Sequence, residues 1–283
     1  MTDRVDIVEM APRDGLQNET AEVPTADKIA LVDMLSKAGF SRIEVTSFVS
    51  PKWVPQLADA AEVMAGIQRE PGLSYGVLTP NIRGLERALH VNPDWVAVFA
   101  SASEGFSKAN LNCTIAKSLE RFRPVVASAQ AVGIPVRGYV SCVTDCPYDG
   151  TVAPGSVADV TRALLDMGCF EVGLGDTIGA GTPDSVGDML DAVLEVATPA
   201  QLGGHFHDTG GRALDNIETC LHRGLRVFDA AVGGLGGCPY APGAKGNVAT
   251  EAVLERVTAL GFETGLDAQA VAAAGRFAQG LRS

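Results

Sequence analysis

The feature that most constrains the fold of this chain is a regular alternation of short apolar segments with longer amphipathic ones. Eight segments rich in apolar and β-branched residues have the length of strands, and they cover residues 5–10, 42–47, 73–78, 95–100, 135–141, 170–175, 203–207 and 227–232. Helix-like segments lie between them, among them 26–38, 115–131, 155–167, 184–196 and 211–221. In residues 26–38 the side chains of Ile29, Val32 and Leu35 recur at helical spacing, which predicts one apolar stripe along a helix.

Strands that alternate with helices predict a parallel sheet, because parallel neighbours need a crossover connection. Eight such units in about 250 residues match a (β/α)8 TIM barrel, with the active site at the carboxyl ends of the strands. The alternative is an open doubly wound sheet, but the turn after the first strand reads APRDG and lacks a G-x-G-x-x-G pattern. We predict one catalytic domain over residues 1–283, with terminal helices from about residue 266 packing outside the barrel or at a dimer interface.

The net charge of the chain limits the kinds of molecule that it can bind. The chain carries 22 Lys and Arg against 34 Asp and Glu, a formal net charge of −12, and no basic run reverses this locally. We therefore expect no nucleic-acid and no membrane partner, and an anionic small substrate would need a few specific cations or a metal to hold it. The first residues contain no long apolar leader, and no apolar run approaches the ~20 residues of a membrane-spanning helix, so the expected location is cytoplasmic.

Polar side chains recur where the predicted strands end. Arg13 and Asp14 follow the first strand, and His205 and His207 lie in the seventh. Residues two apart in a strand point to one face, so the two imidazoles would form a chelating pair at a barrel mouth. The alternative is that both histidines are merely hydrogen-bonded, because His-x-His is a short and common pattern.

Glu44 is a carboxylate within an otherwise apolar and hydroxylic strand. A buried acid is costly unless it is paired, and Arg13 from the neighbouring strand is the expected partner. Such a pair would hold the guanidinium in a fixed orientation for catalysis, or it would be a purely structural ion pair. Arg13 and Asp14 would otherwise form a surface ion pair or a turn, because Asp-Gly is a common turn dipeptide.

Residues 233–247 contain six glycines in fifteen residues, which predicts an irregular loop rather than helix or strand. It is either a plain loop or a mobile lid that carries a functional side chain. Cys238 lies between Gly237 and Pro239, where a thiol could act as proton donor or nucleophile, although most cysteines are inert. The other five cysteines are scattered, so neither a disulfide framework nor a structural zinc site is expected.

A barrel would bring a carboxylate, two imidazoles and the amide of Asn247 to one end. Mixed oxygen and nitrogen donors without a thiolate suit Mg²⁺ or Mn²⁺ with open positions for a substrate. The order of metal affinities alone excludes neither Zn²⁺ nor Co²⁺.

These residues stand in segments that resemble the hydroxymethylglutaryl-CoA lyase family of metal-dependent barrel lyases. The resembling segments are PRDGLQNE (12–19), IEVTSFVSPKWVPQ (43–56), RGYVSC (137–142), LGDTIG (174–179) and the glycine-rich segment through residue 247. Arg-Asp and His-x-His are shared with the wider superfamily, which includes isopropylmalate and homocitrate synthases. The GGCP sequence at 236–239 is narrower and favours the lyase branch.

The resemblance implies cleavage of 3-hydroxy-3-methylglutaryl-CoA to acetoacetate and acetyl-CoA by a homodimer. It implies four metal ligands, which are Asp14, His205, His207 and Asn247. It also implies that Arg13 stabilises enolate charge, that Glu44 orients Arg13, and that Cys238 is the catalytic acid. The hydroxyl proton would pass to His205 or to Asp14, and the sequence does not choose between them.

Two positions depart from the family pattern, because Gly173 stands where Ser is common and Gly210 where Tyr is common. Both are expected near the acyl pocket, so a larger or different acyl group would fit. The alternative functions are a lyase for a related 3-hydroxyacyl-CoA, a synthase that runs the condensation, or a non-catalytic acyl-CoA-binding protein.

Overall fold

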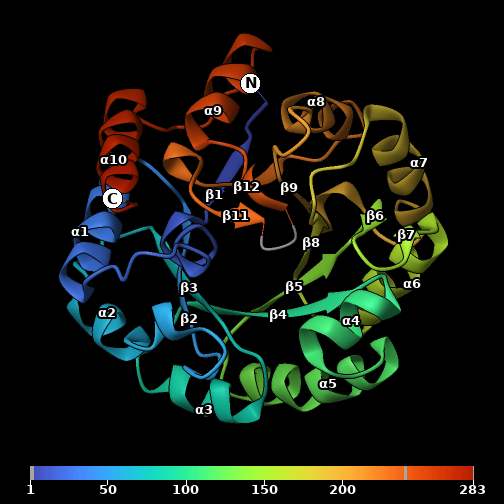
Figure 1. Ribbon diagram of the computed structural model, residues 1–283, viewed down its shortest axis with the longest axis horizontal. Helices are drawn as coiled ribbons and strands as arrows, with labels where there is room; N and C mark the ends of the chain where they lie inside the picture. The colour runs from blue at the N-terminus through green and yellow to red at the C-terminus, as the bar shows by residue number, and fades with distance from the viewer. Residues whose placement is uncertain (1–2, 239–240, 283) are drawn as a thin grey trace.

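The computed structural model describes residues 3–238 and 241–282, and its description of side chains leaves out residues 237–245. Eight parallel strands close into a barrel in the order β1-β10-β9-β8-β5-β4-β3-β2 (Figure 1). The barrel strands are β1 (Asp6–Glu9), β2 (Arg42–Ser47), β3 (Ser74–Leu78), β4 (Trp95–Ser101), β5 (Val136–Ser141), β8 (Glu171–Asp176), β9 (Leu202–Phe206) and β10 (Val227–Ala230). The predicted TIM barrel is confirmed, and an open sheet is excluded because β1 pairs with both β2 and β10.

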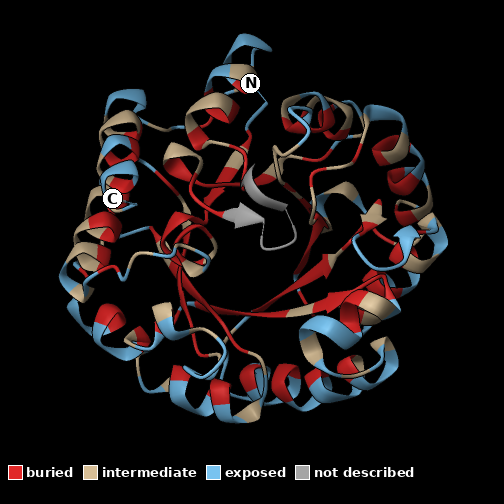
Figure 2. Ribbon diagram, viewed as in Figure 1, coloured by how far each residue is buried: buried red, intermediate tan, exposed pale blue. Residues whose placement is uncertain are grey.

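Helices surround the barrel and cover the outer face of its strands (Figure 1). They are α1 (Thr25–Ser36), α2 (Ala60–Gly66), α3 (Ile82–Leu89), α4 (Glu104–Leu111), α5 (Ile115–Ala131), α6 (Pro154–Asp166), α7 (Pro183–Val193), α8 (Ala213–His222), α9 (Thr250–Ala259) and α10 (Ala268–Gly280). Figure 2 shows buried strands and helices that expose their outer sides, as an apolar stripe on each helix requires. Within the described residues, no helix combines the length and the apolar character needed to cross a bilayer.

The predicted boundaries lie close to the observed ones. The predicted strand 42–47 and helix 115–131 coincide with β2 and α5, and the other predicted ends are displaced by up to three residues. One displacement bears on the site, because β9 ends at Phe206 and His207 lies just beyond it. There His207 forms an isolated antiparallel bridge with Asn247.

The prediction that residues 233–247 contain neither helix nor strand is wrong. A short 3-10 turn, η4 (Val232–Gly234), is followed by β11 (Gly237–Cys238) and β12 (Ala241–Lys245), which pair antiparallel with a register shift. Glycine weakens a strand because it has no side chain to pack, yet its N–H and C=O still pair. In Figure 1 this hairpin projects over the centre of the ring.

A buried carboxyl group joins β1 to the segments that frame the barrel mouth. Glu9 Oε1 accepts hydrogen bonds from the backbone N–H of Ala11 at 2.8 Å and of Val232 at 3.0 Å. Its Oε2 accepts from Thr250 Oγ1 at 2.7 Å. Burial raises the pKa of Glu9 to about 8, although the three hydrogen bonds oppose this rise. The side chain is therefore largely protonated in the folded protein at neutral pH.

Glu9→Gln should make the protein more stable than wild type at about pH 8 and similarly stable near pH 4. Between these values the unfolded wild-type chain releases the Glu9 proton while the folded chain retains it, so the contribution of Glu9 to the free energy of unfolding falls by about 1.4 kcal/mol per pH unit. Glutamine cannot titrate, and its amide reproduces the shape of the protonated acid. Urea unfolding of both proteins across this pH range measures the difference, and a difference that does not change with pH would contradict the prediction.

Candidate active site and metal centre

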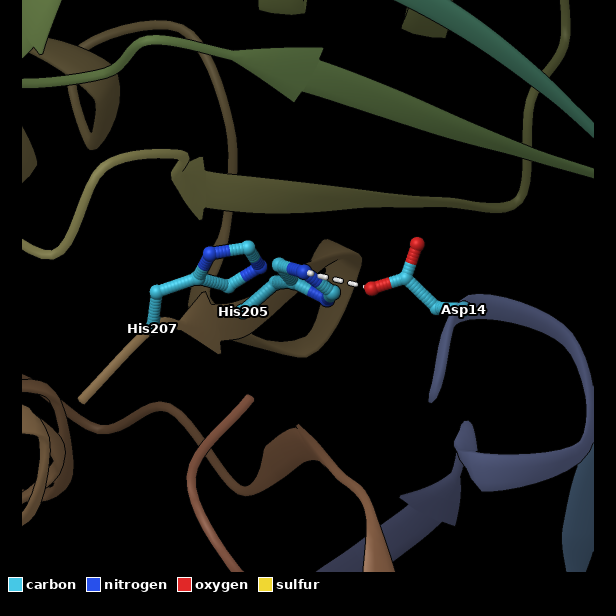
Figure 3. Close-up of side chains that lie close together, drawn as sticks. All are labelled: Asp14, His205 and His207. Atoms are coloured by element: carbon cyan, nitrogen blue, oxygen red, sulfur yellow. Dashed lines mark ion pairs between the residues drawn. The ribbon is translucent and has the colours of Figure 1, made fainter. Parts of the chain in front are cut away.

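Three potential metal ligands converge at the carboxyl ends of β1 and β9. Asp14, His205 and His207 each offer one ligand atom, and these atoms lie within 4.8 Å of one another (Figure 3). The distance from Asp14 Oδ2 to His205 Nε2 is 3.7 Å. Residues far apart in the sequence thus meet at the barrel mouth, as the pattern of polar strand ends predicts.

A tight turn after β1 places Arg13 and Asp14 in this mouth. The turn is the π-helix η1 (Ala11–Gly15), in which the carbonyl of Met10 accepts from the N–H of Asp14 at 2.8 Å and of Gly15 at 3.1 Å. A Cβ at Gly15 would lie only 2.8 Å from the Cβ of Leu235, so the glycine permits the close approach of η1 to the segment after β10.

Asn247 reaches the same place through its bridge with His207. Its Nδ2 donates to Asp14 Oδ2 at 2.8 Å, whereas its Oδ1 is buried and has no hydrogen-bond partner among the described residues. The same holds for His207 Nδ1. A buried acceptor without a partner costs about 1–3 kcal/mol, which indicates that something else satisfies it. Oxygen and imidazole donors with an unsatisfied amide oxygen fit a divalent cation.

The electrostatics of Asp14 and His207 suit metal ligation. Burial alone would raise the pKa of Asp14, but Arg13 and the two histidines outweigh it and hold this pKa far below its usual range. Burial, with the neighbouring His205, lowers the pKa of His207 to about 4. Burial also opposes charge on His205, but the hydrogen bond with Asp229 and the charge of Asp14 raise its pKa. Asp14 is therefore ionised and His207 neutral at neutral pH, which are the states that bind metals.

The predicted pair of Arg13 and Glu44 is present. Arg13 Nε donates to Glu44 Oε1, and Arg13 Nη1 donates to Asp14 Oδ1. The hydroxyl of Tyr139 donates to the other oxygen of Glu44 at 2.7 Å. Glu44 has no exposed side-chain surface, and Arg13 is 8% exposed, so the guanidinium is held in one orientation at the mouth.

Sequence reasoning missed three residues that support these groups from below. Arg137 and Tyr139 lie two apart on β5, and Asp229 lies on β10 beside His205. Arg137 Nη1 donates to the hydroxyl of Tyr139 at 2.8 Å and forms an ion pair with Asp229 Oδ1, also at 2.8 Å. For Arg137 and Asp229 the available signal was a charged residue inside an apolar strand, the same signal that identified Glu44.

A cavity of about 680 Å³ opens over these groups, a volume within the range of small-molecule sites. Arg13, Asp14 and both histidines line it, and its rim includes Trp53. Gly173 and Gly210 are not among its lining residues. Gly173 lies behind Tyr139, where a Cβ would come within 2.7 Å of the ring, and a Cβ at Gly210 would meet the carbonyl of Gly179 at 2.8 Å.

A second groove of about 810 Å³ lies between α9 and α10. Its ionisable lining residues are all acidic, namely Glu251, Glu255 and Glu263. It contains no histidine and no cation, so it offers neither the ligand set nor the positive charge found at the barrel mouth.

The side chain of Cys238 lies outside the described residues. Its backbone pairs with Ala241 in the hairpin that precedes Asn247. The proposed role of its thiol therefore stays a prediction. Five cysteines have described side chains, and all five are free thiols: Cys113, Cys142, Cys146, Cys169 and Cys220.

Comparison with known proteins places this site in a family. The HMGL-like family model matches residues 4–277. A crystal structure of the HMG-CoA lyase from Brucella melitensis is 64% identical and superposes with a TM-score of 0.98, covering 99% of each chain. The 3-hydroxy-3-isohexenylglutaryl-CoA/hydroxymethylglutaryl-CoA lyase of Pseudomonas aeruginosa is 55% identical over 96% of this chain and 91% of its own length.

The mitochondrial hydroxymethylglutaryl-CoA lyase of Bos taurus is 54% identical over 97% of this chain and 84% of its own length. Curated relatives carry both mitochondrial and cytoplasmic enzyme names. The match extends over nearly the whole barrel, including η1, β9 and the segment through Asn247. The chain therefore belongs to the HMGL-like family, in which its similar members are named as hydroxymethylglutaryl-CoA lyases.

Proposed function

We propose that this chain is a metal-dependent carbon–carbon lyase that cleaves 3-hydroxy-3-methylglutaryl-CoA to acetoacetate and acetyl-CoA. The observation that carries the proposal is the convergence of Asp14, His205 and His207 beside the rigid guanidinium of Arg13. The names of the similar enzymes agree with this chemistry.

Asp14, His205, His207 and Asn247 would hold the metal, and their oxygen and nitrogen donors favour Mg²⁺ or Mn²⁺. When bound, such an ion lowers the pKa of a substrate hydroxyl and orients the substrate. Asn247 Oδ1, buried without a partner among the described residues, would gain one by ligation.

The side chains of the site have distinct roles in the cleavage. The substrate hydroxyl gives its proton to Asp14, because His205 with Nε2 on a bound ion and Nδ1 against Asp229 would have no lone pair to accept it. The carbonyl of acetoacetate forms as the carbon–carbon bond breaks. The electron pair of that bond passes to the acetyl-CoA fragment, whose thioester oxygen gains negative charge. Arg13 offsets this charge in an orientation that Glu44 maintains. Cys238 then protonates the carbon, which completes acetyl-CoA.

Two other functions are distinguishable from this one. A lyase for a larger 3-hydroxyacyl-CoA is favoured by the similarity to the Pseudomonas enzyme, whose name includes a longer acyl group. A non-catalytic acyl-CoA-binding protein would bind substrate without releasing product. Incubation with each acyl-CoA, followed by detection of acetoacetate or its longer analogue before and after chelation, separates the three. Full activity after exhaustive chelation would contradict the metal-dependent proposal.

We extend the proposal to the organisation of the protein: residues 1–283 act as one catalytic domain, and the enzyme is a cytoplasmic homodimer. The acidic composition repels an anionic acyl-CoA, so this partner would have to be held by a few specific cations or a metal. Sedimentation velocity tests the dimer directly.

Trp53→Ala should raise the KM for the acyl-CoA at least about fivefold and leave kcat nearly unchanged. Trp53 lines the cavity rim, and its exposed fraction of 83% leaves an aromatic face free for the adenine or pantetheine part of the substrate. Steady-state kinetics measures both constants. Trp53→Phe, which keeps an aromatic face, is the matched control and should stay near wild type. A fall in kcat with unchanged KM would contradict a binding role.

A further inference from the structure

Asp229 lies directly beside one member of the metal-ligand cluster. It stands on β10 in register with His205 on β9, and its side chain has no exposed surface. Its Oδ2 lies 3.1 Å from His205 Nδ1. The carboxylate does not belong to the group of three donors that could share an ion. It contacts one of these three donors, His205.

The opposite side of Asp229 is fixed by a buried cation. Its Oδ1 forms an ion pair with Arg137 Nη1 at 2.8 Å. Arg137 Nε donates to Glu171 Oε1 at 2.7 Å, and Glu171 is paired in turn with Arg42 at 3.0 Å. Arg137 is thereby anchored between β5, β8 and β10, so Asp229 has a fixed partner on each of its two oxygens.

This arrangement dictates where the proton of His205 resides. A neutral imidazole carries one N–H, and a carboxylate can only accept. Nδ1 must therefore carry the hydrogen, which leaves the lone pair of Nε2 facing Asp14 Oδ2 at 3.7 Å. His207 differs, because its Nδ1 has no hydrogen-bond partner among the described residues.

We propose that Asp229 is a positioning residue that selects the tautomer of His205 whose Nε2 is free to bind the metal. Arg137 holds Asp229 in the orientation that this selection needs. The inference rests on the proposed metal site of the lyase, and it requires no contact between Asp229 and the substrate. A partner of this kind typically changes metal affinity by about 10- to 100-fold.

Asp229→Asn is the sharpest test because it keeps the shape and changes the chemistry. Arg137 needs an acceptor, so the amide oxygen should turn to Arg137 and the amide N–H₂ to His205 Nδ1. The hydrogen of the imidazole then moves to Nε2, where it blocks the lone pair. We expect the Kd for Mn²⁺, measured by calorimetry without substrate, to rise about 10- to 100-fold. Circular dichroism checks the fold.

The tautomer is read directly by ¹⁵N NMR of labelled histidine in metal-free protein, recorded at rising pH until the signals of the protonated imidazole have disappeared. Wild type should show Nδ1–H at His205, and Asp229→Asn should show Nε2–H. The wild-type spectrum keeps the inference testable even where the variant does not fold, since Nε2–H in wild type would overturn it.

Glu171→Gln is the matched control. It removes a negative charge from the other side of Arg137, but its amide oxygen can still accept from Arg137 Nε, so Arg137 stays anchored and the contact between Asp229 and His205 is kept. Its Mn²⁺ affinity should stay within about twofold of wild type. An equal loss in both variants, or wild-type affinity in Asp229→Asn, would refute the proposal. Both readouts omit substrate, so a failure of the proposed reaction would leave this inference standing.

Discussion

Asp14→Asn should weaken Mn²⁺ binding and lower the rate of acyl-CoA cleavage by about 100- to 1000-fold or more, with the barrel still folded. The substitution keeps the shape of the side chain and removes its charge. Asp14 lies between the guanidinium of Arg13 and the imidazole of His205, and it accepts a hydrogen bond from Asn247. The asparagine side chain lacks the anionic oxygen that a divalent cation requires. It also leaves the neighbouring cations without a negatively charged partner.

The control is Asp208→Asn, at the carboxylate that directly follows His207. Asp208 Oδ1 accepts from the N–H of Ala213 at the start of α8, and an amide oxygen can do the same. It does not belong to the cluster of three donors. Calorimetry measures the affinity for Mn²⁺, and the release of acetoacetate measures the rate of cleavage. If Asp14→Asn retained wild-type Mn²⁺ affinity, the proposed ligand set would be wrong.

The barrel could be predicted because its signal is local and repeated. Each strand-like segment is short and apolar, and each helix carries an apolar stripe. Few folds can bury the strands and the helix stripes together when this pattern repeats eight times. The position of the site followed from the same fold, because all parallel strands end at one edge. Asp14 and His205 could therefore be placed together although most of the chain separates them.

The support beneath the site could not be predicted in the same way. Arg137, Tyr139 and Asp229 gain their roles from neighbours on other strands, and these contacts depend on the register between β5, β8, β9 and β10. The sequence shows a charge within an apolar strand but not which opposite charge faces it. The pairing of β11 with β12 was missed for a different reason, because glycine-rich segments lack the side-chain pattern from which strands are recognised.

Cys238→Ala should reduce turnover by about 10²- to 10⁴-fold and leave the affinity for the acyl-CoA nearly unchanged. The expectation follows from the chemistry of cleavage, because the acetyl-CoA fragment leaves with an electron pair and needs a proton. Cys238 stands in the hairpin that leads to Asn247, whose amide donates to Asp14, so the hairpin is continuous in sequence with one of the proposed ligands. A thiol carried by this hairpin is in the right part of the chain to supply that proton.

Exchange in deuterated water isolates this step from the rest of the reaction. Wild type should exchange the methyl hydrogens of added acetyl-CoA with solvent, because the acid that protonates the carbon also removes a proton in reverse. Cys238→Ala should lose this exchange while it still binds Mn²⁺ and acetyl-CoA. Cys113→Ala, at a half-buried free thiol, is the control and should exchange like wild type. Exchange that persists in Cys238→Ala would assign the proton transfer to another group, and a non-catalytic acyl-CoA-binding protein would show no exchange in any of the three.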